Sequence, residues 1–296
     1  MSAIDVQRIM FRAIDDPEYR RHLLADPDRA LSGYQLAADE QANLKALTPD
    51  LFYRVVGGYV AHRLVPLRFG GRFVVRPPSP QCAAGPDDVP IILGPHWAFG
   101  NGSHATTESL LIALGECVRP GDAILDLGTG TGILAIAAAR LGAASVLAVD
   151  NDAEAVDAAR QNMQLNGVEA VVRVESASLE YALQMIADGL TAGWNVVAVN
   201  VNATVALNML KGGLRRTVRP GGTLIVSAIK SAEEVTAVDD GLRSAGLHVV
   251  DHRSKNGWLT VIARREEEEA HVGNADAPDS PPSSASSPRS SPGPIR

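Results

Sequence analysis

A glycine turn between two apolar runs constrains this chain more than any other stretch. Residues 123–127 are apolar and fit a buried strand, and residues 128–132 then read Gly-Thr-Gly-Thr-Gly. Residues 133–141 are rich in Ala and Leu and favour a helix, and a second apolar run at 145–149 leads to Asp150. Strand, turn, helix and strand in this order predict half of a doubly wound α/β sheet. Such sheets bind ligands at the carboxyl ends of their strands.

The acids around this turn allow two cofactor interpretations. Residues 130–135 fit the G-x-G-x-x-A pattern of a nicotinamide dinucleotide site, and Asp150 follows about 20 residues later. Asp126, however, precedes the glycines as D-x-G-x-G-x-G, and its carboxylate suits the ammonium group of S-adenosylmethionine. This extra acid favours S-adenosylmethionine, with Asp150 accepting both ribose hydroxyls. The structural alternative is that Asp126 and Asp150 cap strand or helix ends. Three glycines would hold the amino-acid end of the cofactor, because their backbone can approach it closely: Gly128, Gly130 and Gly132.

Composition limits the classes of function. The 296 residues are 46% hydrophobic and 21% charged, which is typical of one large globular domain with smaller additions. The net charge of −7 argues against direct nucleic-acid binding. Cys82 and Cys117 are too few for a disulfide framework or a zinc site. The longest apolar stretch contains Arg140 and the N-terminus lacks a signal segment, so we expect a cytoplasmic protein without metal or membrane partner.

Residues 1–62 are expected to form a separate small helical domain. Asp-Pro pairs at 16–17 and 26–27 are typical of helix starts, and further helices are predicted at 37–47 and 52–62. The segment faintly resembles helical small subunits and leader-recognition modules, through a pattern carried by Asp26, Pro27, Leu31, Tyr34, Leu36 and Glu40. It is therefore either a structural cap on the rest of the protein or a module for substrate recognition.

Residues 63–105 predict a β-rich connector and a cofactor loop. A hairpin is indicated at 69–75 and a strand at 89–93. Residues 99–104 read Phe-Gly-Asn-Gly-Ser-His, a polar segment around one aromatic ring that can close over a cofactor. An ordinary glycine loop is the alternative.

Residues 106–265 are expected to continue the α/β pattern as one domain. Thr106 or Thr107 is expected to cap the first helix of this domain. Pro220-Gly221-Gly222 predicts a turn, and Asn256-Gly257 predicts a type I′ hairpin. Residues 266–296 are acidic and then rich in Ser and Pro, which is typical of a disordered tail. Further strands are expected at 171–174, 194–199, 223–229, 248–254 and 258–264, and further helices at 152–166, 178–188 and 231–245.

Two motifs give the chain a family resemblance. Residues 98–107 read AFGNGSHATT and residues 126–143 read DLGTGTGILAIAAARLGA. In this order they resemble the A-F-G-T-G-x-H-x-T-T and D-x-G-T-G-S-G-I-L-A-I-A-A motifs of the ribosomal protein L11 methyltransferase family (PrmA-like), over about residues 66–264. Asn101 stands where the family has threonine, and the N-terminal helices do not look like the family's docking domain. The resemblance implies a class I methyltransferase that uses S-adenosylmethionine, with a seven-stranded Rossmann-like sheet whose last strand is antiparallel.

The resemblance also implies site residues. Phe99, Gly100 and Thr107 would line the cofactor loop, and residues 175–177 would form the turn that contacts adenine. Asn200 would lie beside the transferable methyl group, where it contacts the cofactor and positions the substrate. His104 is the only nearby candidate for a catalytic base, although its family role is to shape the loop.

Several functions remain open from the sequence. The leading hypothesis is N-methylation of a protein or peptide amine, with a ribosomal protein like L11 as the candidate substrate. One alternative is a biosynthetic methyltransferase for a small molecule or a ribosomally made peptide. Two more distant ones are an NAD-dependent oxidoreductase and a partner-binding protein that has kept the fold without catalysis.

Overall fold

The computed structural model describes most of the chain in a few continuous stretches. These are residues 17–48, 66–76, 84–94, 98–100 and 104–267, with the single positions 6, 9, 10, 12, 13, 78 and 102. The predictions for residues 52–62, for most of the tail and for Asn101 and Cys82 concern positions outside the described residues. No helix in the described stretches is long and apolar enough to cross a membrane.

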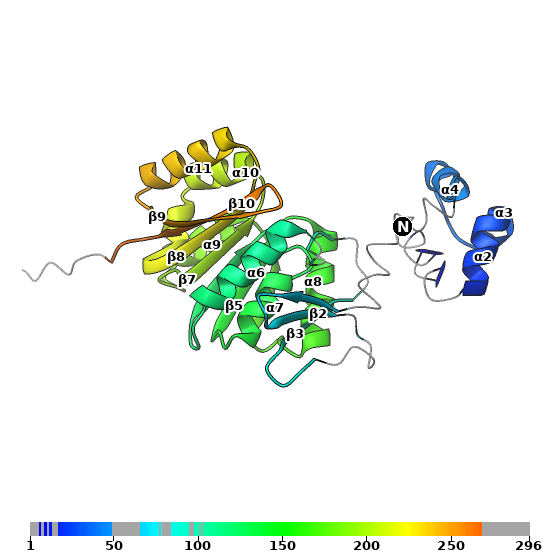
Figure 1. Ribbon diagram of the computed structural model, residues 1–296, viewed down its shortest axis with the longest axis horizontal. Helices are drawn as coiled ribbons and strands as arrows, with labels where there is room; N and C mark the ends of the chain where they lie inside the picture. Colours follow the sequence, from blue (N-terminus) through cyan, green and yellow to red (C-terminus); the bar gives the residue numbers. More distant parts are fainter. Residues whose placement is uncertain are drawn as a thin grey trace, which may run out of the picture.

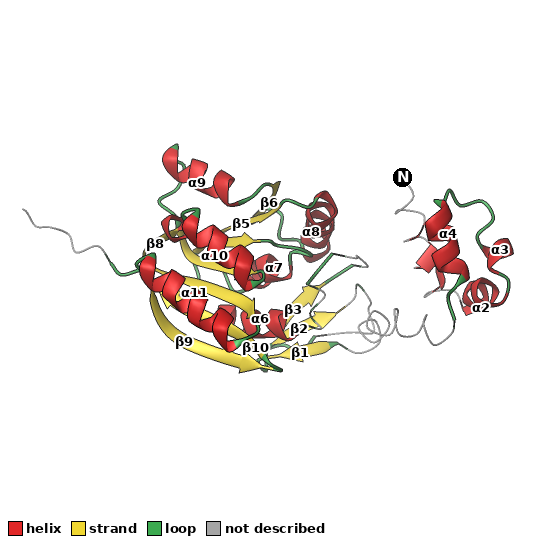
Figure 2. Ribbon diagram, turned by 90° about the horizontal axis from the view of Figure 1, so that it is seen from above, coloured by secondary structure: helices red, strands yellow, loops and turns green. Residues whose placement is uncertain are grey.

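The described N-terminal residues form short helices around a core of their own. They are α2 (Pro17–Ala25), α3 (Pro27–Ala30) and α4 (Ala38–Lys45), shown at one end of the chain in Figure 2. Asp26 caps α3 through its side chain, which accepts from the Arg29 N–H at 3.3 Å. The Tyr19 hydroxyl donates to the Ala30 carbonyl at 3.0 Å and joins α2 to α3. The apolar core comprises Ile9, Met10, Ala13, Tyr19, Leu23, Leu31 and Leu44.

A three-stranded sheet follows. β1 (Leu67–Phe69) and β2 (Phe73–Arg76) form the expected antiparallel hairpin, and β3 (Val89–Ile92) runs parallel to β2. Two buried asparagines of the later helix α8 (Ala153–Asn166) bind the backbone at the end of β3. Asn166 bonds both the N–H (2.9 Å) and the carbonyl (2.7 Å) of Ile92, and Asn162 accepts from Gly94 N–H at 2.8 Å. These bonds fix the chain just before the predicted cofactor loop.

The large sheet has the predicted seven strands. In sequence order they are β4 (Ala123–Leu127), β5 (Ser145–Asp150), β6 (Val172–Ser176), β7 (Trp194–Asn200), β8 (Val218–Ile229), β9 (His248–Lys255) and β10 (Trp258–Arg264). Their spatial order is β6-β5-β4-β7-β8-β10-β9. β4 to β8 are parallel, and β10 is antiparallel to both β8 and β9. The order reverses at β4, between β5 and β7, and this is where a doubly wound sheet binds ligands.

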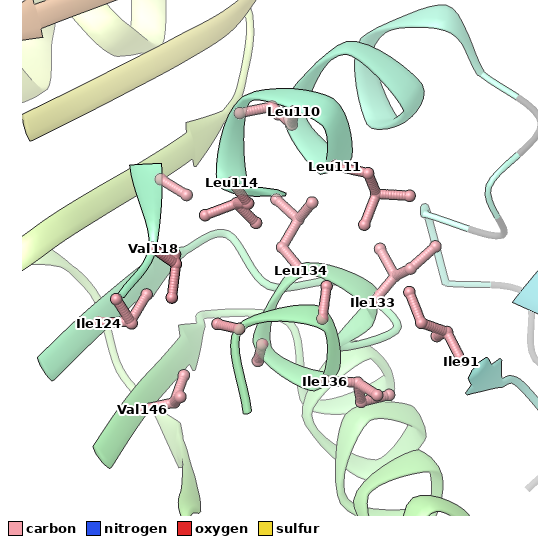
Figure 3. Packing of buried hydrophobic residues seen from close by; sticks show 14 of the residues in the cluster. Ile91, Leu110, Leu111, Leu114, Val118, Ile124, Ile133, Leu134, Ile136 and Val146 are labelled. Atoms are coloured by element: carbon pink, nitrogen blue, oxygen red, sulfur yellow. The ribbon is translucent and has the colours of Figure 1, made fainter. Parts of the chain in front are cut away.

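Helices cover both faces of this sheet (Figure 1). α6 (Ala105–Cys117), α7 (Ile133–Arg140) and α8 (Ala153–Asn166) share one core, and α9 (Leu179–Ala187), α10 (Ala203–Lys211) and α11 (Ala232–Ser244) share the other. Alternate residues of β4 serve the two cores: Ile124 faces the first, and Leu125 and Leu127 face the second. Figure 3 shows Leu111 and Leu114 of α6 pointing toward α7. Burial on both faces explains why the strands read as continuous apolar runs.

Three local expectations are resolved by the structure. The predicted cap at Thr106 or Thr107 is wrong, because His104 caps α6 and its ring accepts from the Thr106 N–H. The predicted turn at Pro220-Gly221-Gly222 is also wrong. These residues lie inside β8 as an irregularity, where Gly221 N–H donates to the Arg265 carbonyl at 2.9 Å. The hairpin prediction is confirmed, since Asn256 and Gly257 have φ values of 50° and 76°.

Candidate functional site

A pocket of about 430 Å³ lies at the carboxyl ends of three parallel strands. Leu127 and Gly128 lie at the end of β4, Val149 and Asp150 at the end of β5, and Asn200 and Val201 at the end of β7. The other lining residues are Ala98, Phe99, Gly130, Asn151, Asp152, Ala155, Ala177, Ser178, Leu179, Val205 and Met209. Five of the predicted site residues therefore meet at one pocket: Phe99, Gly128, Gly130, Asp150 and Asn200. Ala177, from the expected adenine turn, also lines it.

The glycine turn is bonded to the end of β5. The N–H groups of Gly128 and Thr129 donate to the Val149 carbonyl at 2.9 and 3.0 Å. The Gly130 N–H donates to Asp150 Oδ2 at 2.9 Å, and Asp150 Oδ1 accepts from Asp152 N–H at 3.1 Å. Asp150 thus shapes the turn while it lines the pocket, and each carboxylate oxygen keeps a second lone pair for a ligand.

Two glycines of the turn are constrained within the protein, Gly130 by packing against backbone and Gly132 chiefly by its positive φ. A Cβ on Gly130 would lie 2.2 Å from the Phe99 carbonyl oxygen, and a Cβ on Gly132 would lie 2.3 Å from Met163 Cε. Both also have positive φ, of 54° and 80°. Gly132 is the N-cap of α7 and does not line the pocket, so it supports the turn without facing the pocket.

Residues 98–100, which we call the pocket segment, lie against the glycine turn. The Thr131 N–H donates to the Phe99 carbonyl at 2.9 Å, and Thr131 Oγ1 donates to the Gly100 carbonyl at 2.8 Å. The Phe99 ring is 56% exposed, whereas Gly100 is buried and does not line the pocket. Asn162 completes the arrangement, since its Nδ2 donates to the Thr131 carbonyl at 2.8 Å. No local sequence signal indicates the roles of Thr131 and Asn162, because their hydrogen-bond partners lie about 30 residues away.

Asp126 lies at the end of β4 behind the turn. Its side chain is 1% exposed, and Oδ2 accepts from the Thr129 hydroxyl at 2.7 Å. Among the described residues Oδ1 has no hydrogen-bond partner. Burial, with a smaller contribution from nearby Asp150, raises the pKa of the Asp126 carboxyl to about 7. A cationic ligand that approached this carboxylate would offset the cost of its burial.

Asn200 ends β7 and presents a second buried acceptor. Its Oδ1 has no hydrogen-bond partner within the described part of the chain, and the residue lines the pocket. Unpaired buried acceptors are unusual in folded proteins and indicate a missing donor. Thr107 is fully buried in α6, where its Oγ1 is likewise unpaired among the described residues, and it does not line the pocket.

His104 lies beside the site rather than in its lining. Its Nδ1 is 2.8 Å from Thr106 Oγ1. Its ring makes edge contacts with Phe99 and Trp258, at centroid distances of 5.5 and 4.9 Å. These contacts account for a structural role, and the role of His104 as a base stays a prediction.

Known proteins resemble this chain in sequence. A family model described as ribosomal protein L11 methyltransferase (PrmA) matches residues 60–266. A ribosomal protein L11 methyltransferase from Symbiobacterium thermophilum is 39% identical over 200 residues, which are 68% of this chain and 62% of that protein. One from Geobacillus kaustophilus is 41% identical over 177 residues, 60% of this chain and 54% of that protein.

A solved structure agrees with these relatives. The crystal structure of a ribosomal protein L11 methylase from Lactobacillus delbrueckii subsp. bulgaricus superposes with a TM-score of 0.60 at 26% identity, over 68% of this chain and 99% of that one. The chain thus spans less than two thirds of the length of the two relatives above. Helices α2 to α4 lie before the matched residues.

Proposed function

The chain belongs to the ribosomal protein L11 methyltransferase (PrmA) family, and from this we propose that it is an S-adenosylmethionine-dependent methyltransferase. Its proposed substrate is a protein or peptide amine, with a ribosomal protein like L11 as the first candidate. The observation that carries the proposal is the buried acceptor Asn200 Oδ1 in the pocket lining, together with Asp126 Oδ1 in β4 behind the glycine turn; neither atom has a hydrogen-bond partner among the described residues.

The residues of the pocket fit this cofactor. Its ribose hydroxyls would use the free lone pairs of Asp150, while Gly128 and Gly130 leave room for the amino-acid end. Asp126 does not itself line the pocket, and we propose that its carboxylate pairs with the ammonium group from behind the turn. We also propose Phe99 as the residue that covers the cofactor, because its exposed ring lines the same pocket. Gly100, Gly132 and Thr107 support the pocket from behind.

The chain's own contribution to the reaction is to position the acceptor. When bound, S-adenosylmethionine supplies a methyl group that is already electrophilic. A lysine amine, with a reference pKa near 10.4, costs about 4.6 kcal/mol to deprotonate at pH 7. Asn200 Oδ1 can accept a hydrogen bond from the amine and orient its lone pair toward the methyl group, and orientation of this kind lowers the barrier by several kcal/mol. An amide cannot take up the proton, so the proton leaves to water or to His104.

Cofactor binding is the first test. Calorimetry with S-adenosylmethionine, S-adenosylhomocysteine and NAD should show binding of the first two alone. A double comparison then tests the ribose contact. Asp150→Asn should weaken S-adenosylhomocysteine about tenfold, and should weaken its 2′-deoxy analogue much less. Binding of NAD instead would move the protein to the oxidoreductase class.

Methyl transfer is the second test. Label from S-adenosylmethionine should enter purified ribosomal protein L11. Asn200→Ala should lower kcat about 100-fold while cofactor affinity changes only a few-fold. Asn202→Ser is the matched control, because Asn202 caps α10 by accepting from Val205 N–H at 3.0 Å and does not line the pocket. Equal losses in both variants would contradict the role of Asn200.

The role of His104 needs a substitution that keeps its cap. Asn is among the best N-cap residues, so His104→Asn preserves the start of α6 but removes a titratable ring. If His104 is the base, kcat of this variant falls at least 100-fold and the acidic limb of its pH profile disappears. A kcat within threefold of the wild type would leave His104 with the structural role only.

A second candidate substrate is a ribosomally made peptide or a small molecule, recognised by the N-terminal helices. It is favoured by the separate core of these helices and by their position before the matched residues. Leu23→Asp disrupts that core, since Leu23 is 1% exposed, whereas Arg21→Asp on the exposed side of α2 does not. If the helices recognise the substrate, Leu23→Asp raises its KM at least tenfold with unchanged cofactor affinity. An unchanged KM for L11 in both variants would favour the first candidate.

A further inference from the structure

Four side chains form a continuous stack beside the pocket. The Phe99 ring meets the edge of His104 at 5.5 Å, and His104 meets Trp258 at 4.9 Å. The Lys230 ammonium lies 5.1 Å from the Trp258 ring centroid. The stack runs from the pocket segment to Trp258, the first residue of β10, and to Lys230, just after β8.

A bulge in β8 directs the chain toward this stack. Thr260 pairs with Ser227 and Leu259 pairs with Ile229, so Ala228 is an extra residue with no partner in the ladder. Its φ is 72°, which costs a residue with a Cβ about 1 kcal/mol. Bulges re-aim the side chains that follow them. Ser227 also pairs with Asn200, so the bulge begins one residue beyond the site.

The β9–β10 hairpin also contacts helix α6, which starts next to His104. Lys255 pairs with Glu108 in the first turn of α6, and Arg253 pairs with Glu116 near its end at 2.6 Å. The β9–β10 hairpin therefore holds both His104 and the helix that His104 caps. The pocket segment, in turn, has one anchor on the glycine turn through Thr131 and a second on His104.

We propose that Trp258 and Lys230 are positioning residues for the pocket segment: they hold His104 and Phe99 so that the segment stays against the glycine turn. The consequence for cofactor binding rests on the proposed function, but the positioning itself does not. Neither residue lines the pocket.

Amide hydrogen exchange tests the positioning without any ligand. The Thr131 N–H is protected by the Phe99 carbonyl, whereas the Gly128 N–H in the same turn is protected by Val149 of β5. Release of the pocket segment therefore exposes the first amide and spares the second. Loss of an edge-to-face contact shifts such an opening equilibrium about fivefold.

Trp258→Leu should speed exchange at Thr131 about fivefold and leave Gly128 unchanged. Trp258→Phe keeps a ring edge against His104 and should restore protection, and Lys230→Met should speed exchange about twofold. Arg253→Gln is the matched control, because it loosens the hairpin on α6 but leaves the stack in place. Unchanged Thr131 exchange in Trp258→Leu, or equal acceleration at Thr131 and Gly128, would overturn the proposal.

Cofactor titration tests whether the position of the pocket segment affects cofactor affinity. Trp258→Leu should raise the KM for S-adenosylmethionine about fivefold with a smaller change in kcat, and Trp258→Phe should reverse this. If the wild type binds no cofactor, the proposed function fails, and the exchange experiment still decides whether Trp258 positions the segment. If cofactor binds equally well in both variants despite faster exchange, the segment does not contribute to affinity and the functional consequence is refuted.

Discussion

The two walls of the pocket are built in different ways. One wall consists of strand ends, where Gly128, Asp150 and Asn200 continue from strands paired on both sides in the parallel ladder. The other is the pocket segment, which is held by two hydrogen bonds from Thr131 and by the ring stack through His104. The first wall cannot move unless the sheet unfolds, whereas the second can separate from the site at a cost of a few contacts. The difference predicts which substitutions change stability and which change only the site.

The largest effect is expected where the two walls touch. Gly130→Ala places a Cβ 2.2 Å from the Phe99 carbonyl at a φ of 54°, and should lower the free energy of unfolding by about 3 kcal/mol or release the pocket segment. Gly167→Ala is the matched control: its φ is 61° but no atom lies within 4 Å, so only about 1 kcal/mol should be lost. Urea unfolding and exchange at Thr131 measure both. Equal losses in the two variants would show that the walls do not press on one another.

The free energy of unfolding should depend on pH through Asp126, which lies in β4 behind the strand wall. Because burial raises the pKa of Asp126 to about 7, the folded chain keeps this proton between about pH 4 and 7, while the unfolded chain releases it. The free energy of unfolding therefore falls as pH rises through this range. Asp126→Asn should remove about 2 kcal/mol of this dependence, measured by urea unfolding at pH 5 and pH 8.

The same carboxyl predicts how cofactor affinity responds to pH. The ammonium of S-adenosylmethionine favours the ionised carboxylate, so affinity should rise as pH increases through 7 and should be flat and weaker in Asp126→Asn. Thr129→Val leaves the carboxyl but removes its hydrogen bond, and should move the midpoint upward. An identical pH profile in wild type and Asp126→Asn would contradict the assignment of the ammonium site.

The pocket segment should respond to its hydroxyl anchor more modestly. Thr131→Val leaves the buried Gly100 carbonyl without its donor and should cost about 1.5 kcal/mol, and Thr131→Ser should keep most of it. Limited chymotrypsin cleavage after the exposed Phe99 is the measurement, because it follows the opening of the segment. Cleavage that is equal in Thr131→Val and Thr131→Ser would show that the hydroxyl does not anchor the segment.

The smallest effect is a gain. Ala228→Gly relieves the positive φ of the bulge and should raise the free energy of unfolding by about 0.5 kcal/mol. Lys230 and Trp258 would then share a more flexible support, so exchange at Thr131 should rise slightly even as the fold gains stability. A gain in stability with stronger protection at Thr131 would mean that the bulge does not position the stack.

The strand wall was predictable because its signals are local. The apolar run of β4, the glycine turn and Asp150 lie within 28 residues of sequence from 123 to 150. The place of Asn200 and the seven-stranded sheet with an antiparallel last strand were expected from the family resemblance. Helix ends were predictable where the capping residue is a common one, as with Asp152 and Gly167 of α8. The cap at His104 was not, because histidine is a rare N-cap and two threonines follow it.

The pocket segment was predictable only as a loop. Its anchors come from Thr131, from Asn162 and from the hairpin at Trp258, more than 30 residues away in each case, and no local pattern records such contacts. The glycine turn shows the same limit. The sequence assigns Gly130 and Gly132 to a cofactor, whereas the Phe99 carbonyl already requires Gly130 to lack a side chain, and the positive φ of Gly132 favours glycine there without any ligand.

The double duty of Asp150 restricts how this site could change its ligand. The carboxylate that faces the pocket also holds the Gly130 N–H, and it accepts from Asp152 at the start of α8. An exchange for a basic or small residue, as a switch to a phosphorylated ribose would need, would release the turn before it created any new affinity. A change of ligand at this end of the pocket would therefore have to replace the turn and the strand end together.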